Sequence, residues 1–210
     1  MGVRRGTRRG EEGVPDLTHM IANDDNFLPL KAAGGDVAAF ARLVQIHSGL
    51  VYRVALRMLG AGEAQDASQE VWIRVWRNIR NFRGDSAFGT WLYKITVNTC
   101  LNILRKERRR EARETGDGFF HLPTPPGGED DPEAATLSRE RMGEVVEALK
   151  GIRAEHRAAV VLRHMEGLSY GEIAQILEVP DGTAKGWASR GRASLLLRLV
   201  PESRDGRKRA

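Results

Sequence analysis

A set of residues between positions 91 and 105 combines an aromatic ring, amides and cations at helical spacing. The set is Trp91, Lys94, Asn98, Asn102 and Arg105. Their spacing of three or four residues places them on one face of a helix. Aromatic rings stack on unpaired bases, amides bond to base edges, and cations bind phosphates, so this face predicts a surface for single-stranded nucleic acid. The alternative interpretation is that Trp91 and Tyr93 fill the core.

A second pattern, near the carboxyl terminus, is typical of a helix-turn-helix. Ser169 is followed three residues later by Glu172, which is a capping-box signal before an apolar helix. The turn at residues 179–183 comes next, and Asp181 or Thr183 starts a basic helix. The basic residues are Lys185, Arg190 and Arg192. Such a helix fits the major groove of duplex DNA. The alternative is an ordinary helical hairpin with a solvated basic face.

No group of residues in the sequence is arranged for catalysis. Metal-assisted chemistry needs clustered carboxylates or Cys and His at ligand spacing, and covalent catalysis needs a nucleophile beside a base. The acidic residues fall on predicted helix faces or in a linker, and Cys100 is the single cysteine. We therefore expect a protein that is not an enzyme, without metal or cofactor, from a reducing compartment.

Length and charge agree with a nucleic-acid-binding protein. The 210 residues suffice for two small domains, and 33 basic against 28 acidic residues give a formal net charge of +5. This excess favours polyanionic partners through counterion release. No apolar run approaches membrane-spanning length, and none follows the arginine-rich amino terminus. We expect a cytoplasmic protein with no membrane insertion.

Apolar residues recur at three-to-four spacing nearly everywhere, and alternating β-branched runs are absent, so the predicted fold class is all-α. One helix is expected from Asp36 to Gly60, and a second from Glu63 to Arg80 after a turn at residues 60–62. A third helix, capped by Asp85 or Ser86, runs through Leu104. The Pro- and Gly-rich stretch 116–132 then indicates a flexible linker before a second helical domain.

These elements give a predicted division of the chain into two small helical domains joined by a flexible linker. A flexible leader, expected to end in a turn near Leu28-Pro29, precedes the first domain, and a basic tail follows the second. The predicted segments are leader 1–30, first domain 31–112, linker 113–135, second domain 136–200 and tail 201–210.

Ordered runs of residues in both domains resemble the extracytoplasmic-function sigma factors of the sigma-70 family. The runs DASQEVW (66–72), VWRN (75–78) and FRGDSAFGTWLY (82–93) closely resemble region 2 of that family. EHR (155–157), VLR (161–163), EGLSY (166–170) and the later Gly191-Arg192 resemble region 4. The resemblance covers about residues 36–105 and 138–198. It implies a factor that guides bacterial core RNA polymerase to promoters and helps to open them.

The resemblance also implies three binding surfaces. The second helix would bind the β′ clamp of core RNA polymerase, and region 4 its β flap. The candidates for polymerase binding are Asp66, Gln69, Glu70 and Arg77. The candidates for binding the minus-ten element as a single strand are Phe82, Arg83, Ser86, Phe88, Trp91, Lys94, Asn98, Asn102 and Arg105. The candidates for binding the minus-thirty-five element as duplex are Ser169, Tyr170, Thr183, Lys185, Trp187, Arg190 and Arg192. An anti-sigma factor that covers these surfaces is implied as a further partner.

The recognition helix departs from the family pattern. Ala184, Gly186 and Ala188 stand among positions where the family carries larger side chains, and Gly186 costs about 1 kcal/mol relative to alanine in a helix interior. Ala184 and Ala188 are expected to offer little to a core. Either Trp187 supplies the missing packing or minus-thirty-five recognition is altered. Asn102 stands where the family often has an acidic residue, so the base preference of the family is not carried over.

Two other classes of protein compete with the sigma-factor interpretation. A stand-alone helix-turn-helix regulator would bind duplex DNA without polymerase, but it leaves residues 66–92 without a role. A helical adaptor that binds only proteins would use its basic residues as solvated surface, and it would show no salt-sensitive association with DNA.

Overall fold

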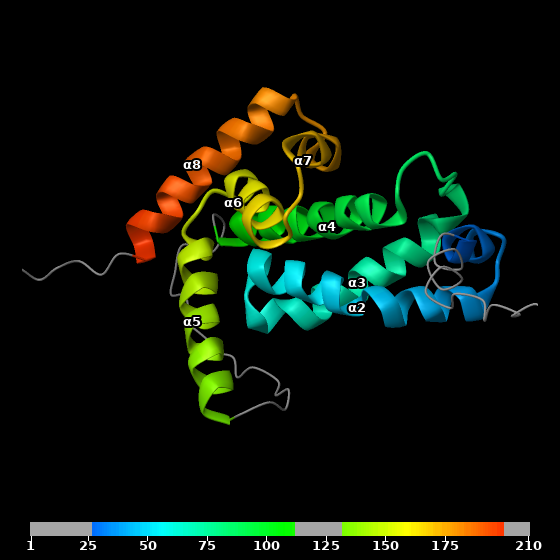
Figure 1. The fold of residues 1–210 in the computed structure, drawn as a ribbon, viewed down its shortest axis with the longest axis horizontal. Helices are drawn as coiled ribbons and strands as arrows, with labels where there is room; N and C mark the ends of the chain where they lie inside the picture. Colours follow the sequence, from blue (N-terminus) through cyan, green and yellow to red (C-terminus); the bar gives the residue numbers. More distant parts are fainter. Residues whose placement is uncertain (1–26, 112–131, 200–210) are drawn as a thin grey trace, which may run out of the picture.

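The computed structural model describes residues 27–111 and 132–199, and every regular element in these two ranges is helical. The first range contains α2 (Val37–Leu59), α3 (Ala61–Asn78), the 3-10 turn η1 (Ile79–Asn81) and α4 (Phe88–Glu111). The second contains α5 (Pro132–Lys150), α6 (Ala154–Val160), the π-helical segment η2 (Val161–Met165), α7 (Tyr170–Leu177) and α8 (Asp181–Leu199). The predicted all-α class is confirmed (Figure 1). No helix in the two described ranges is long and apolar enough to cross a membrane.

Helix α2 begins and ends where the sequence predicts. The Asp36 side chain caps it by accepting a 3.0 Å hydrogen bond from the backbone N–H of Ala39. Gly60 ends it with a φ of +95°, a conformation that favours glycine. The predicted turn of three residues is wrong, because Gly60 alone separates α2 from α3. A Cβ on Gly60 would lie 2.5 Å from Cε of Lys150, so the joint is also crowded by the second domain.

Two other predicted boundaries are wrong. Residues 27–33 are helical, where a turn at Leu28-Pro29 was expected. Proline is tolerated early in a helix, and burial of Pro29 and Ala32 holds this segment on the first domain. Helix α4 begins at Phe88, directly after Ala87, so neither Asp85 nor Ser86 occupies the capping position. The predicted tail, residues 1–26 of the leader and residues 113–131 of the predicted linker lie outside the described residues.

The second domain packs its last helix against α6 through small residues. Ala184, Ala188 and Gly191 of α8 are buried there. The expectation that Ala184 and Ala188 offer little to a core is wrong, since small side chains let the two helix backbones approach closely. Trp187 is half-buried and packs on the same core, with its ring 6.3 Å from that of His156.

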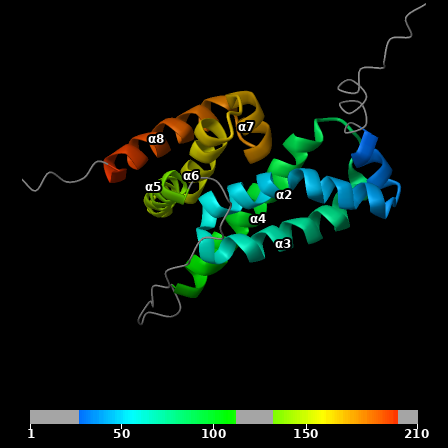
Figure 2. The same ribbon diagram turned by 60° about the horizontal axis from the view of Figure 1, so that its bottom comes forward.

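The two domains pack directly against one another. One cluster of buried residues joins α2 and α4 of the first domain to α6, α7 and α8 of the second. Helix α4 lies between α3 on one side and α7 on the other, and α5 crosses the end of α2 (Figures 1 and 2). A second cluster is confined to the first domain and lies between α2, α3 and the start of α4.

Candidate polymerase and promoter interfaces

Helix α3 presents a mixed polar and apolar face to solvent, opposite its buried stripe. Asp66, Gln69 and Arg77 are exposed on this face, as the sequence predicts for a docking surface. Glu70 is half-buried and pairs with Arg74 one turn later, with 2.7 Å between Nε and Oε1. These four side chains lie on one side of the helix, and we call this surface the α3 face.

Two large apolar residues of the α3 face were not predicted as site residues. Ile73 is 45% exposed and Trp76 is 44% exposed. The indole of Trp76 is held against Phe40 of α2 with ring centroids 4.7 Å apart. Exposed aromatic and aliphatic side chains beside charged ones are typical of the centre of a protein interface. Ile73 and Trp76 fall outside the apolar stripe of this helix in the sequence, and this position was the signal that could have identified them as exposed interface residues.

A pocket of about 350 Å³ opens between α3, η1 and α4. Trp91, Lys94 and Asn98 line it from α4, so the structure brings three of the predicted minus-ten residues together. The opposite wall comes from residues that the sequence interpretation missed. They are Arg74, Asn78 and Asn81. The pocket therefore combines an aromatic ring, amides and cations, which are the groups that stack on a base and bond to its edges.

The segment that leads into α4 is held by an aromatic cluster. Phe82 and Phe88 are each only 9% exposed, and their rings lie 5.6 Å apart. The Trp91 ring lies 5.5 Å from Phe82 and 5.7 Å from Phe88. The two phenylalanines therefore support the segment from beneath, while Arg83 and Ser86 are exposed on it. Tyr93 is buried, as the core interpretation expected for it, and Trp91 is only half-buried.

The last two predicted minus-ten residues lie farther along α4. Asn102 and Arg105 are not part of the pocket lining. They bond to each other, with 2.8 Å between Nη1 of Arg105 and Oδ1 of Asn102. The predicted minus-ten set thus divides into three parts: a segment with Arg83 and Ser86 exposed above buried Phe82 and Phe88, a pocket, and a separate pair.

The predicted capping box of the helix-turn-helix is confirmed. The Ser169 hydroxyl accepts from the backbone N–H of Glu172, and the Glu172 carboxylate accepts from the backbone N–H of Ser169. The Ser169 hydroxyl also donates to the Glu172 carboxylate at 2.6 Å, and this bond, followed by the one from the Ser169 backbone N–H, lowers the pKa of Glu172. Tyr170 packs its ring under the guanidinium of Arg163, 4.7 Å from the centroid. The Ser169 hydroxyl, predicted to contact DNA, is thus already engaged in forming the start of α7.

Helix α8 carries its basic residues on more than one side. Lys185 and Arg192 are exposed two turns apart on one line of the helix, with exposed Ser189 between them. Arg190 is exposed on another side, and its positive charge contributes to the lowered pKa of His156, after burial. Thr183 and Trp187 are half-buried. Ser189 was missed because its side chain is small and uncharged.

Comparison with known proteins places both domains in one family. Residues 43–110 match the family model for Sigma-70 region 2, and residues 142–195 match the model for Sigma-70, region 4. The ECF RNA polymerase sigma-E factor of Escherichia coli strain K12 is 34% identical over 181 residues, covering 84% of this chain and 95% of that protein. The sigma-E factor of Haemophilus influenzae is 34% identical over 185 residues, covering 84% of this chain and 96% of that protein.

Solved structures agree on the fold. The sigma factor RpoE of Bartonella quintana, in complex with the anti-sigma factor NepR, has a TM-score of 0.63 at 22% identity and covers 79% of this chain and 99% of its own. CnrH, in complex with the cytosolic domain of CnrY, has a TM-score of 0.58 at 25% identity and covers 85% of this chain and 99% of its own. The chain therefore belongs to the sigma-70 family, among the extracytoplasmic-function RNA polymerase sigma factors.

Proposed function

We propose that the chain is an alternative sigma factor that binds bacterial core RNA polymerase, directs it to specific promoters and promotes strand opening. Membership of a family of transcription initiation factors supports this function over that of a stand-alone regulator. We further propose that it has no catalytic activity of its own and acts in the cytoplasm, together with the polymerase. The domain division is also a proposal, with region 2 at 31–112 and region 4 at 136–200; the helical segment at 27–33 and the start of α5 at Pro132 extend the two domains beyond these bounds.

The α3 face is the proposed docking surface for the β′ clamp. Asp66, Gln69 and Arg77 supply charge and hydrogen bonds around Ile73 and Trp76. An apolar centre with a polar rim is the usual anatomy of a protein interface. The α3 face stays accessible while the second domain packs on the other side of α4 (Figure 2).

The pocket between α3 and α4 is the observation that carries the minus-ten proposal. A base turned out of the duplex would stack on Trp91 and meet the amide of Asn98, with Lys94 near the phosphates. Capturing a base in this way can offset the cost of a few kcal/mol for unstacking and unpairing it. Strand opening would then draw its energy from binding and would need no catalytic residue.

Region 4 is proposed to bind the minus-thirty-five element as duplex through α8. Lys185 and Arg192 would contact phosphates or guanine edges, and Ser189 between them would join the contact. We also propose binding of region 4 to the β flap and regulation by an anti-sigma factor. Complexes of RpoE with NepR and of CnrH with CnrY support the regulatory part.

Gel filtration with sigma-free core polymerase tests the docking proposal. Wild type is expected to form a stable complex, and Asp66→Ala/Gln69→Ala is expected to bind at least about tenfold more weakly, as for an interface hot spot. Gln45→Ala, an exposed amide on α2, is the matched control and should bind like wild type. Duplex DNA binding by the wild type without any polymerase complex would instead favour the stand-alone regulator.

A further inference from the structure

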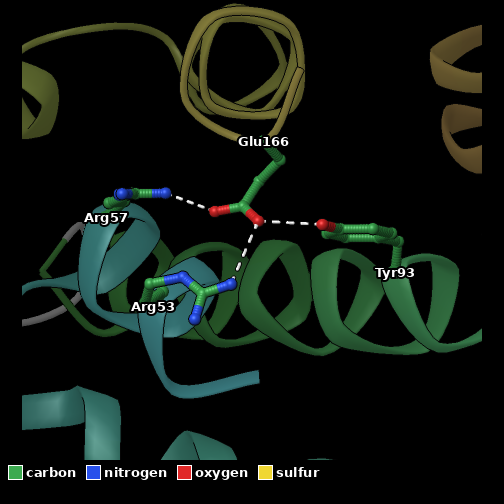
Figure 3. A network of polar contacts seen from close by, with 4 residues as sticks. All are labelled: Arg53, Arg57, Tyr93 and Glu166. Atoms are coloured by element: carbon green, nitrogen blue, oxygen red, sulfur yellow. Dashed lines mark hydrogen bonds and ion pairs between the residues drawn. The ribbon is translucent and has the colours of Figure 1, made fainter. Parts of the chain in front are cut away.

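The contacts between the two domains include a buried carboxylate whose partners all come from the other domain. Glu166 follows η2 in region 4, and its side chain is only 4% exposed. Arg57 of α2 donates to one carboxylate oxygen, and the Tyr93 hydroxyl of α4 donates to the other at 2.8 Å. Arg53 of α2 lies 3.7 Å from the second oxygen. Figure 3 shows Glu166 entering region 2 between these three side chains, which together we call the Glu166 network.

A second polar contact crosses the domain boundary through Arg157. This buried residue of α6 donates to the backbone carbonyl of Met58, near the end of α2. Its other terminal nitrogen donates to the carbonyls of Lys150 at 2.5 Å and Ile152 at 3.2 Å, where α5 ends. Burial lowers the pKa of Arg157 to about 10. The guanidinium thus joins the ends of one helix from each domain.

The same arrangement joins the two DNA-binding regions into one compact body. Lys94, which lines the pocket, forms an ion pair with Glu178 at the end of α7, 2.8 Å from Nζ to Oε1. The minus-ten and minus-thirty-five elements lie about 25 base pairs apart, which is about 85 Å along duplex DNA. Domains in direct contact cannot reach two sites at that separation.

The chain between the domains is long enough to allow an open form. Residues 112–131 lie between the last residue of α4 and the first of α5, and this stretch can extend to about 70 Å at about 3.5 Å per residue. Separated domains together with this stretch would therefore cover the promoter span. The α3 face, in contrast, is exposed while the domains are packed together.

We infer that the free chain holds itself in a closed form through the Glu166 network, exposing the α3 face for polymerase but unable to engage both promoter elements until the network breaks. The consequence of the closed form for transcription rests on the proposed sigma function. The existence of the Glu166 network does not depend on that function. Removing one member of a buried ion pair leaves the others without compensation, so a single substitution should favour separation of the domains.

Energy transfer between two dyes on the full-length chain measures the closed fraction. Gln45→Cys on α2 and Gln175→Cys on α7 provide exposed labelling sites in the two domains. Cys100 is buried in the cluster that joins the two domains, where burial raises the pKa of its thiol to about 12, and Cys100→Ser replaces it in the labelled chain so that opening exposes no third thiol. Glu166→Gln should shift the ratio of closed to open molecules about tenfold towards open. Glu178→Gln, which removes the exposed pair with Lys94, should shift it less than about twofold.

Exchanging the charges of Arg57 and Glu166 distinguishes a variant that has lost only the network from one that has lost its fold. Arg57→Gln should open the chain as Glu166→Gln does, and the pair Arg57→Glu with Glu166→Arg should restore part of the closed fraction. Circular dichroism must show wild-type helicity for each variant that is compared. Equal energy transfer in wild type, Glu166→Gln and Arg57→Gln would overturn the inference, as would equal opening by Glu178→Gln.

Addition of core polymerase and promoter DNA separates this inference from the proposed function. The DNA probe is a duplex pool enriched by the wild-type holoenzyme. Wild type is expected to lose energy transfer when polymerase and DNA are both present, and Glu166→Gln should reach half-maximal promoter binding at a lower protein concentration. If polymerase does not bind, the proposed sigma function is wrong. The dye measurement on the free chain would still show whether the Glu166 network holds the two domains together.

Discussion

Gly191 of α8 lies so close to α6 that a Cβ on this glycine would stand 2.5 Å from Cγ2 of Val160. The same Cβ would lie 2.7 Å from the carbonyl oxygen of His156, which belongs to the helix backbone and has little freedom to move. The two helices of region 4 therefore cross at a distance that only a residue without a side chain permits. This crossing orients the outward line of α8 that carries Lys185 and Arg192.

Gly191→Ala is expected to lower the free energy of unfolding by about 1–3 kcal/mol, because the added methyl overpacks the crossing. Gly143→Ala in α5 is the matched control, since a Cβ there would meet nothing within 4 Å. That control should be neutral or stabilise by up to about 1 kcal/mol through helix propensity. Urea denaturation followed by circular dichroism measures both. Equal stability of the two variants would contradict the close crossing.

Alkaline pH should open the closed form through Tyr93. Burial, followed by the hydrogen bond to Glu166, raises the pKa of Tyr93 above its ordinary value of about 10. The packed state prefers the neutral phenol, so its contribution to stability is complete below about pH 10 and is lost as the pH rises towards the folded-state pKa. Energy transfer in the labelled chain, measured between about pH 9 and pH 11, should fall. Tyr93→Phe should lack this part of the pH dependence.

The pocket predicts which amide of α4 matters for single-strand binding. Asn98→Ala should weaken binding of the holoenzyme to single-stranded DNA by about 1–3 kcal/mol, the range of a well-formed base contact. Asn102→Ala should cost less, because Asn102 lies outside the pocket and bonds to Arg105. The probe is an oligonucleotide pool enriched by the wild-type holoenzyme, read by fluorescence anisotropy. A larger effect of Asn102→Ala than of Asn98→Ala would mean that the single strand binds farther along α4 than the pocket.

The two sides of α8 should differ in their contribution to duplex binding. Lys185→Ala removes a cation from the line that also carries Ser189 and Arg192, so the slope of log affinity against log salt should fall by about 0.9. Arg190→Ala removes the same charge from another side and should change the slope much less. Titration of mixed-sequence duplex DNA with the full-length chain measures both slopes. Equal losses would mean that the charge of α8 acts without regard to its orientation.

Local signals in the sequence predict the helices of this protein well. The Asp36 cap of α2 and the Ser169–Glu172 capping box both depend on residues within one turn of each other. The helical segment at 27–33 was missed because its stability comes from burial against the first domain, which no local pattern records.

Features that depend on long-range packing were not predictable in the same way. Ala184 and Ala188 are poor core residues by size, and only the close approach of α6 makes them suitable. The pocket needs Arg74, Asn78 and Asn81 from the neighbouring helix and turn, which the periodicity of α4 does not specify. The Glu166 network joins Glu166 to Arg57, 109 positions earlier in the chain, and nothing in the spacing of its residues indicates it.

The distance in sequence between Glu166 and its partners also sets the order in which the two domains form during synthesis. Tyr93 precedes Glu166 by 73 residues, and at about 5–20 residues per second the ribosome needs about 4–15 s to make that stretch. The helices of region 2 form from local contacts within this interval, whereas docking of region 4 depends on contacts of high contact order. Each newly made chain thus spends seconds with its first domain complete and uncovered, and a nascent chain is open to capture by a partner before its own second domain exists.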